Sequence, residues 1–266
     1  MITETLLALS AAGAVGIGLA RSRRVELYRS LERRIASIVS STRVDLGSAL
    51  QRPVPSFDVR LAHMADVLPD ATVDELRSQA LRLVRPERSY IPTHKKGGTV
   101  AYDSLFETAP ALVALYHSAD MQALVSRIVG VKVGPTPIYD QSSLSVLFYE
   151  KPGDHIGWHF DHNFYRGRHF TVLLPVINQG SAGGGLSHAT LKAKIADREI
   201  DIATPPNTLI VFEGAKVNHK VTPIVEGERR LVISMTYCTD PRANMVQGVV
   251  RRIKDVAFFG PRALWT

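Results

Sequence analysis

Residues 149–163 read Tyr-Glu-Lys-Pro-Gly-Asp-His-Ile-Gly-Trp-His-Phe-Asp-His-Asn. At the centre of this stretch stand His159, Phe160 and Asp161. In an extended chain, residues two apart point to the same face, so His159 and Asp161 can reach one metal ion while Phe160 turns away. Pro152 and two nearby glycines disfavour a helix here. The stretch is therefore predicted to be a strand end that carries two metal ligands.

A third ligand has to come from a strand elsewhere in the chain. His219 fits this role, because it follows the apolar, strand-like run 208–212 and a turn around Gly214. Two imidazoles and one carboxylate form the facial set that suits Fe(II) and leaves further coordination positions open. The alternative is a zinc site made by His155 and His159 on a helix, but the glycines disfavour that helix and no glutamate follows His155.

The second half of the chain has the pattern of a double-sheet β-fold. Short apolar runs alternate there with turn residues, at 144–149, 170–174, 208–212 and 231–235. This spacing is typical of sandwiches and jelly rolls. The first half instead has helical patterns, one from a capping box at Thr72 and one over Ala109–Val129. We therefore predict an α+β protein, a double-stranded β-helix (jelly roll) with N-terminal helices packed on its major sheet.

The chain resembles the Fe(II)/2-oxoglutarate dioxygenases, and among them the branch that includes the prolyl hydroxylases. The resemblance extends from about Ser142 to Tyr237. It depends on an ordered set of features: the His-x-Asp triplet at 159–161, the distal His219, an arginine ten residues later, and a glycine turn at 183–186. The triplet alone is a weak signal, whereas the full set in this order is specific.

This resemblance implies cofactors and residue roles. His159, Asp161 and His219 would bind Fe(II), with 2-oxoglutarate and dioxygen as co-substrates and ascorbate as an addition needed in vitro. Arg229 would pair with the far carboxylate of 2-oxoglutarate, and Tyr149 would add a hydrogen bond. Turnover would release succinate and CO2 and hydroxylate a substrate, either a small molecule such as an amino acid or a protein side chain.

Asp161 also distinguishes two reactions. In related halogenases the aspartate is replaced by a small residue, so that chloride can bind the metal. Because Asp161 is present, the resemblance implies hydroxylation. The alternative function is an inactive, membrane-tethered jelly roll that acts as a binding or scaffold protein, but such a protein would be expected to have lost at least one of these dispersed residues.

Strand geometry alone leaves the choice between Arg229 and Arg230 open. We expect His219 and the arginines to lie on the two strands of a hairpin closed near Gly227. A two-residue loop would put Arg230 on the face of His219, whereas a three-residue loop with Gly227 at positive φ would turn Arg229 inward. The spacing in the family favours Arg229.

Further positions are candidates for substrate contact, although each could equally serve in packing. Three of them flank the metal motif: Trp158, Asn163 and Tyr165. Residues 90–99 read as a polar loop with paired glycines, and such loops often frame a substrate mouth. Within that loop, His94 and Lys95 are the candidates.

Composition sets broad limits. The chain has 266 residues, of which 45% are hydrophobic, as expected for a globular protein. The single cysteine, Cys238, excludes a disulfide framework, fits a reducing compartment and is expected to serve in packing. Seven arginines and two glutamates between Arg21 and Arg43 give +5 of the net charge of +7. The remainder is nearly balanced, so we expect no nucleic-acid partner.

We divide the chain into three parts. Residues 1–24 are a hydrophobic segment and a candidate membrane anchor, which would associate with the membrane through residues 2–20 and keep the rest cytoplasmic because the arginines follow it. A merely accessory helix is the alternative. Residues 25–57 are a basic helix and linker. Residues 58–266 are the dioxygenase domain, with a helical part at 58–135 and a jelly-roll core at 136–240; no role is assigned to residues 244–266.

Overall fold

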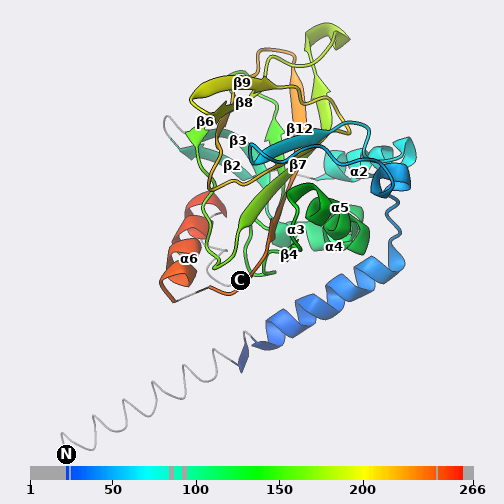
Figure 1. The fold of residues 1–266 in the computed structure, drawn as a ribbon, viewed down its shortest axis with the longest axis vertical. Helices are drawn as coiled ribbons and strands as arrows, with labels where there is room; N and C mark the ends of the chain where they lie inside the picture. The colour runs from blue at the N-terminus through cyan, green and yellow to red at the C-terminus, as the bar shows by residue number, and fades with distance from the viewer. Residues whose placement is uncertain (1–21, 24, 84–86, 92–94, 244, 260–266) are drawn as a thin grey trace, which may run out of the picture.

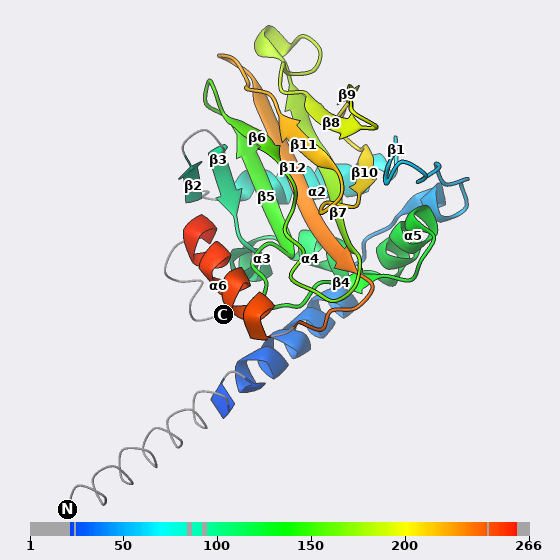
Figure 2. The ribbon, with the colours of Figure 1, turned by 60° about the vertical axis from the view of Figure 1, so that its left-hand side comes forward.

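The computed structural model describes residues 22–23, 25–83, 87–91, 95–243 and 245–259. A curled antiparallel sheet forms its centre (Figures 1 and 2). Its strands are β1 (Leu61–Met64), β2 (Glu87–Ile91), β3 (Lys95–Val100), β4 (Gly134–Pro135), β5 (Leu144–Tyr149), β6 (His155–His159), β7 (His169–Gln179), β8 (Leu191–Ile195), β9 (Arg198–Ile202), β10 (Leu209–Phe212), β11 (Asn218–Val221) and β12 (Arg229–Cys238).

The order of the strands is that of a jelly roll, which confirms the predicted fold. They run β1, β10, β7, β12, β5, β3, β6, β11, β8 and β9, with β2 paired to β3 and β4 paired to β12. β3 joins the two halves of the roll, because its residues 98–100 pair with β5 and its residues 95–96 pair with β6. The larger half therefore ends at β5 and the smaller half begins at β6.

Strand β12 shows how the two faces of the sheet divide. Leu231, Ile233 and Met235 are fully buried in the core that the helices share. Val232 points the other way, into a second apolar cluster inside the roll, and Ser234 lines a cavity on that side. Since residues two apart share a face, this one strand separates the helix-covered core from the cavity.

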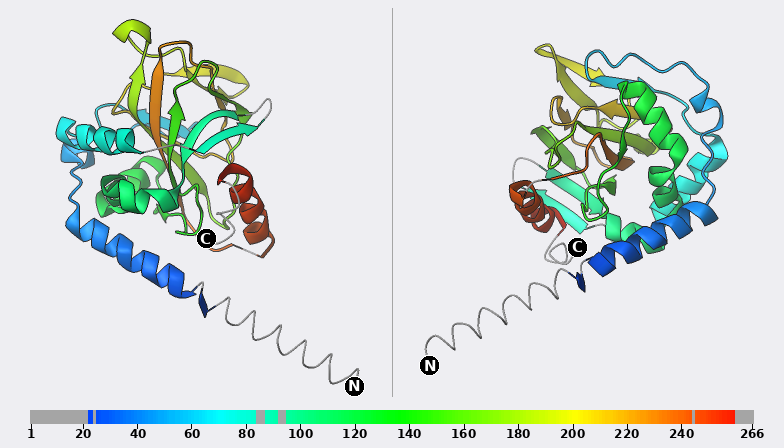
Figure 3. Two further views of the ribbon diagram at one scale, coloured as in Figure 1. Left: turned by 180° about the vertical axis from the view of Figure 1, so that it is seen from behind. Right: turned by 60° about the horizontal axis from the view of Figure 1, so that its bottom comes forward.

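The helices are α2 (Asp70–Arg82), α3 (Tyr102–Thr108), α4 (Pro110–His117), α5 (Ala119–Val129) and α6 (Met245–Phe259). Figures 1 and 3 show α2 to α5 together on one side of the sheet, with α6 on the opposite side. Helices α2 to α5 contribute to the core behind β12, as predicted for helices packed on the major sheet. The structure also has two short 3-10 helices, η1 (Gly47–Leu50) and η2 (Ser181–Gly183).

The predicted helix over Ala109–Val129 is in fact two helices. Ser118 interrupts it with an extended ψ of 140°, and its hydroxyl accepts the backbone N–H of Met121 at 3.1 Å. A serine in this position caps the start of a helix and so begins α5. Gly130 ends α5 with φ at 70°, as expected for the C-cap. Helix α2 begins at Asp70, two residues before the predicted start at Thr72.

Residues 95–100 form strand β3, so the prediction of a loop there was wrong. Gly97 accounts both for the wrong prediction of a loop and for the close strand pairing that is found. A Cβ at position 97 would lie 3.1 Å from the carbonyl oxygen of Phe148 on the neighbouring strand. Glycine in a strand often marks such a close backbone approach, whereas in the sequence alone paired glycines indicate a turn.

The helix over residues 25–41 lies along the domain as an amphipathic surface helix. Leu31, Ile35 and Ile38 pack against the main core, while Leu27 and Val39, which belong to the same predicted stripe, are exposed. No helix in the described ranges is long and apolar enough to cross a membrane. The candidate anchor at residues 2–20 lies outside those ranges. The linker that follows the helix is also packed, with Leu46 and Ala49 buried.

Candidate metal centre and cavity

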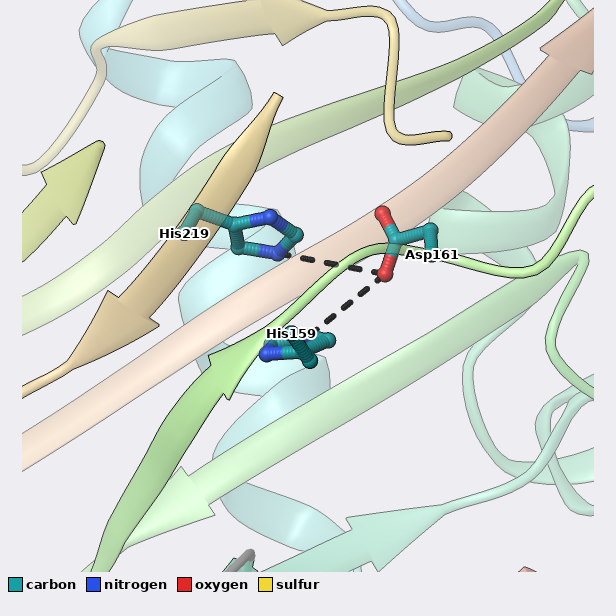
Figure 4. A group of neighbouring side chains, drawn as sticks. All are labelled: His159, Asp161 and His219. Carbon is teal, nitrogen blue, oxygen red and sulfur yellow. Dashed lines mark ion pairs between the residues drawn. The ribbon is translucent and has the colours of Figure 1, made fainter. Parts of the chain in front are cut away.

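Three side chains predicted as metal ligands meet at the open end of the smaller half-sheet (Figure 4). His159 ends β6, Asp161 follows two residues later, and His219 lies opposite His159 in the pairing of β6 with β11. The Nε2 atoms of His159 and His219 lie 3.6 and 3.8 Å from Oδ1 of Asp161. One potential ligand atom from each residue lies within 4.8 Å of the others, which is the arrangement of three ligands around one ion.

Backbone carbonyls fix the orientation of both imidazoles. Nδ1 of His159 donates to the carbonyl oxygen of Gly157 at 2.8 Å, and Nδ1 of His219 donates to that of Val217 at 3.0 Å. The lone pair of each ring is thereby placed on Nε2, the nitrogen that faces Asp161. Such hydrogen bonds set the tautomer of a metal-binding histidine before the metal arrives.

A compact cradle holds the Asp161 carboxylate in one orientation. The Thr171 hydroxyl donates to Oδ2 at 2.5 Å, and the backbone N–H of Asp161 donates to the carbonyl oxygen of Gly214 at 3.0 Å. With Oδ2 held by Thr171, Oδ1 points toward the two imidazoles. A Cβ at position 214 would lie 2.5 Å from Oδ2 and 2.7 Å from the threonine hydroxyl, so the cradle requires glycine there.

Gly214→Ala is therefore expected to weaken Fe(II) binding by ~10- to 100-fold, the range typical of lost support around a metal ligand. The added methyl group would push Asp161 out of its position. Isothermal titration calorimetry of the full chain under anaerobic conditions measures this. Gly248→Ala is the matched control, since a Cβ there meets nothing within 4 Å and the metal affinity should not change. If Gly214→Ala and Gly248→Ala bound Fe(II) equally well, the cradle would not require glycine at position 214.

The three ligands differ in their charge states. Burial would raise the pKa of Asp161, but the charges of the two histidines and the hydrogen bonds from His159 and Thr171 hold it well below its usual range. Burial lowers the pKa of His219. Burial also acts to lower the pKa of His159, but the hydrogen bond and charge of Asp161 outweigh it, so the net shift is upward. The metal-free site thus combines an ionised carboxylate with two imidazoles whose pKa values shift in opposite directions.

Metal binding should consequently be linked to the loss of a proton from His159. The pKa of His159 is raised from its ordinary value of 6.5, so a proton competes with the metal as the pH falls through that raised pKa. Affinity should therefore increase with rising pH, by at most about tenfold per unit. Calorimetry between about pH 6 and 8, in buffers of different ionisation enthalpy, counts the proton. Affinity independent of pH, with no proton release, would contradict this assignment.

The metal ligands lie in the wall of a cavity of about 220 Å³ inside the roll. Arg230 and Tyr149 form its wall where β12 pairs with β5, since the two residues lie directly opposite each other in register. The Arg230 guanidinium is 5.1 Å from the centre of the Tyr149 ring, and the arginine is only 1% exposed. Its Nε and Nη2 atoms, and the Tyr149 hydroxyl, have no hydrogen-bond partner in the described structure. Buried donors of this kind point to an anionic ligand.

Arg229 lies outside the cavity, which corrects the sequence prediction for this residue. Its side chain is 44% exposed and pairs with Glu150 at 2.6 Å on the surface. The expected hairpin does not exist: β11 pairs with β6 and β8, whereas β12 pairs with β5 and β7. Gly227 does have a positive φ of 77°, but it serves a connection between the two halves of the roll. Arg230, left open by strand geometry, is the inward arginine.

A second polar region of the cavity is built around Asp140. The carboxylate accepts hydrogen bonds from the Tyr165 hydroxyl at 2.6 Å and from Nζ of Lys254 at 3.1 Å. Burial would raise its pKa, but the charge of Lys254 and the Tyr165 hydrogen bond lower it to about 2. Lys254 belongs to α6, so the C-terminal helix forms part of the cavity wall. Helix α6, to which the sequence assigned no role, therefore contributes Lys254 to this wall.

The other sequence candidates are placed as follows. Tyr165 is buried and supports Asp140, and Asn163 makes local turn hydrogen bonds to residues 165 and 167. Trp158 lies between Lys194 and Lys220, with their ammonium groups 4.7 and 4.5 Å from its ring centre, and does not line the cavity. Cys238 is buried beside Phe164 and Tyr165, in the expected packing role.

Several cavity residues were not assigned from the sequence, among them Asp140, His162, His169 and Lys254. His162 and His169 line the cavity, and their closeness to the metal motif was the only available signal. His169 is 5% exposed and its Nδ1 has no partner in the described part of the chain. Lys254 had no signal at all, because it comes from a helix almost a hundred residues beyond the motif.

Both the sequence and the structure of the chain are similar to known proteins. The sequence model of the family described as Halogenase D matches residues 57–250, more than half of the chain. The chain belongs to the Halogenase D family. No curated protein sequence gave a significant match. The family name refers to halogenation, whereas the chain has an aspartate, Asp161, in the metal motif.

Solved structures share the fold. The prolyl hydroxylase from Trichoplax adhaerens, solved with a hypoxia-inducible-factor peptide fragment, is 16% identical with a TM-score of 0.54, covering 69% of this chain and 84% of its own. The epimerase SnoN, solved with Fe3+, alpha-ketoglutarate and nogalamycin RO, is 15% identical with a TM-score of 0.57, covering 72% and 84%. An oxidoreductase of the 2OG-Fe(II) oxygenase family from Burkholderia pseudomallei is 14% identical with a TM-score of 0.54, covering 77% and 97%. The predicted resemblance to Fe(II)/2-oxoglutarate oxygenases is thus confirmed in the fold.

Proposed function

We propose that this member of the Halogenase D family is an Fe(II)- and 2-oxoglutarate-dependent oxygenase that hydroxylates either a small molecule or a protein side chain. The observation that carries the proposal is that one cavity contains both a three-residue metal centre and, at Arg230, a buried arginine with unpartnered donors. A metal chelated by a dicarboxylate needs both features in one cavity. The reaction would release succinate and CO2 together with the hydroxylated product.

The ligand set fits Fe(II). His159, His219 and Asp161 offer two imidazole nitrogens and one carboxylate oxygen, the combination found in non-haem Fe(II) oxygenases. When bound, Fe(II) with 2-oxoglutarate supplies the oxidising chemistry, in which dioxygen is reduced, the oxo acid is decarboxylated and one oxygen atom goes to the substrate C–H bond. The protein contributes the fixed imidazole tautomers and the held carboxylate.

Arg230 and Tyr149 would hold the far carboxylate of 2-oxoglutarate. A guanidinium presents parallel N–H donors that match the two oxygens of a carboxylate, and burial strengthens the pairing. The surrounding wall is apolar and includes Leu147, Leu173 and Val232. These side chains exclude water from the reacting centre, so a reactive oxidant is directed to the substrate.

Hydroxylation is proposed in preference to halogenation because of Asp161. Its Oδ1 atom lies beside both imidazoles and would bind the metal together with them, so it would take the coordination position that a halide requires. Thr171 and Gly214 hold the carboxylate there, so it is not free to swing away. The match to a halogenase family therefore coexists with a complete two-histidine, one-carboxylate site.

The test is performed on the full chain with Fe(II), ascorbate and 2-oxoglutarate in chloride-containing buffer. Binding of 2-oxoglutarate and formation of succinate are measured first, without added substrate. Small molecules and peptides are then screened for acceleration of succinate release, and the product is analysed by mass spectrometry. We expect a product heavier by one oxygen atom. A chlorinated product would overturn hydroxylation, and failure to bind Fe(II) and 2-oxoglutarate would leave a binding or scaffold protein.

A further inference from the structure

His169, the first residue of β7, lines the cavity and takes no part in the metal and co-substrate site described above. The residue is 5% exposed, and its Nδ1 atom has no hydrogen-bond partner among the described residues. Its ring stacks on that of Tyr165, with the ring centres 6.1 Å apart. Half a turn of the imidazole keeps this stack and exchanges its two edges, because the outer torsion of a histidine is roughly two-fold. A ring nitrogen of His169 can therefore face a ligand in the cavity.

The register of the larger half-sheet shows on which side of the metal centre His169 lies. Thr171, which holds Asp161, is paired with Thr236 of β12. Arg230 precedes Thr236 along β12, and His169 precedes Thr171 along β7. Because the two strands are antiparallel, Arg230 and His169 lie on opposite sides of the Thr171–Thr236 pair. If the co-substrate extends from Arg230 to the metal, the side of His169 is left for the substrate.

The chemistry at this end of the cavity favours an uncharged ligand group. The Asp140 carboxylate accepts from Nζ of Lys254 at 3.1 Å, so these two charges offset each other. Burial lowers the pKa of His169 despite the nearby carboxylates of Asp140 and Asp161, so the neutral ring is favoured. A neutral imidazole has one nitrogen that donates and one that accepts. A hydroxyl group also donates and accepts, whereas a carboxylate only accepts and an ammonium group only donates.

The neighbouring wall is lined by hydroxyl groups. Ser145 and Ser234 lie directly opposite each other on β5 and β12, and both line the cavity. The charged wall residue Lys95 lies further toward the co-substrate arginine. It donates to the Thr99 hydroxyl at 2.8 Å, and Thr99 pairs with Leu147, which follows Ser145 along β5 in that direction. Polar, uncharged groups thus lie between the cations of the co-substrate end and His169.

We propose that His169 hydrogen-bonds an uncharged hydroxyl group of the substrate and thereby makes the oxygenase specific for a hydroxyl-bearing molecule. This inference rests on the proposed function, because it assigns the rest of the cavity to Fe(II) and 2-oxoglutarate. Two residues of a strand span about 7 Å, so the contact would fix the substrate close to Thr171 and the metal centre. It would determine which C–H bond faces the metal. The hydroxyl can belong to a free small molecule or to a serine side chain, and the experiment distinguishes these sources.

Three variants separate the hydrogen bond from other effects. His169→Phe keeps a flat ring to stack on Tyr165 and removes both ring nitrogens. His169→Gln restores one donor and one acceptor. His63→Phe is the matched control, because His63 is an exposed residue of β1 and does not line the cavity. Since His169→Phe also removes a buried nitrogen that has no partner, the midpoint of its thermal unfolding should not fall.

The experiment uses pairs of probes that differ by one hydroxyl group. Benzyl alcohol and toluene represent a free small molecule, and N-acetylserinamide and N-acetylalaninamide represent a protein side chain. Benzylamine and benzoate add a charge to the same ring. The full chain is first shown to bind Fe(II) and 2-oxoglutarate, a step that tests the proposed function by itself. Binding of each probe to that loaded, anaerobic protein is then measured by calorimetry, so the readout does not depend on turnover.

We expect the hydroxyl member of one pair to bind the wild type ~10-fold more tightly than its partner, since an unpaired buried nitrogen carries a cost of that order. The pair that shows the preference identifies the source of the hydroxyl. Benzylamine and benzoate should bind more weakly than benzyl alcohol. His169→Phe should lose the preference without losing affinity for 2-oxoglutarate, while His169→Gln and His63→Phe keep it.

Three results would overturn the role of His169. They are an equal affinity within both pairs for the wild type, a charged probe that binds more tightly than benzyl alcohol, and a hydroxyl preference that survives in His169→Phe. A fall in the thermal midpoint of His169→Phe with equal weakening of every probe would show a purely structural residue and would also overturn it. Failure of the wild type to bind 2-oxoglutarate would instead overturn the proposed function.

Discussion

Arg230→Met should raise the Kd of 2-oxoglutarate by about 100-fold, while Arg229→Met should leave it within about twofold. Truncating one partner of a buried charge pair costs ~2 to 5 kcal/mol, and each 1.4 kcal/mol is a factor of about ten. Arg230 is 1% exposed and directed into the cavity, whereas the Arg229 side chain is 44% exposed and pairs with Glu150. Calorimetry of the Fe(II)-loaded chain under anaerobic conditions gives both constants.

The two arginine variants control for each other. They change the same residue type at adjacent positions of β12, so differences in expression or global charge cancel. Arg229→Met removes a surface ion pair worth at most about 1 kcal/mol. Arg230→Met removes a buried, unpaired charge, so the free energy of unfolding should not decrease. If Arg229→Met lost affinity for 2-oxoglutarate and Arg230→Met did not, Arg229 would be the co-substrate arginine, as the spacing in the family predicts. The assignment of Arg230 from the structure would then be wrong.

The sequence did contain a signal for the correct arginine. Positions 230, 232, 234 and 236 share one face of β12, and 231, 233, 235 and 237 share the other. The second set is uniformly large and apolar, and it packs against the helices. The first set includes Ser234 and Thr236, as expected for the wall of a polar cavity. The sequence analysis instead assumed that β11 and β12 form one hairpin and chose the arginine from the length of its loop. The two strands in fact belong to different halves of the roll.

Features determined by local chemistry were predictable from the sequence. The placement of His159 and Asp161 on one side follows from the period of two in an extended chain. The jelly roll follows from the spacing of apolar runs, and Gly130 ends its helix because glycine tolerates a positive φ. His219 was identified by its position after a strand, and the register of β11 on β6 brings it opposite His159.

Features determined by distant packing were not predictable. Residues 95–100 have the composition of a turn and become a strand because β2, β5 and β6 pair with them. Lys254 reaches the cavity because α6 packs beside the sheet, and nothing near Lys254 in the sequence specifies Asp140 as its partner. The contact of Lys254 with Asp140 joins residues 114 positions apart, so no local pattern carries it.

Asp161→Ala should weaken Fe(II) binding by at least about 100-fold and abolish succinate formation. Loss of supporting groups alone costs ~10- to 100-fold in metal affinity, and here a ligand itself is removed. Asp161 is also the anion that offsets the metal charge, since its pKa is held well below the usual range and it is ionised at neutral pH. Calorimetry with Fe(II) and a succinate assay measure the two effects.

Asp161→Asn and Thr171→Val separate the charge of this ligand from its orientation. The asparagine keeps the size of Asp161 and can still accept from the Thr171 hydroxyl, but it lacks the negative charge, so it should approach the alanine variant in metal affinity. Thr171→Val keeps the charge and loses the 2.5 Å hydrogen bond, so its loss should be smaller, about tenfold. If Asp161→Asn bound Fe(II) as tightly as the wild type, the carboxylate would not be a metal ligand, and the argument for hydroxylation over halogenation would lose its foundation.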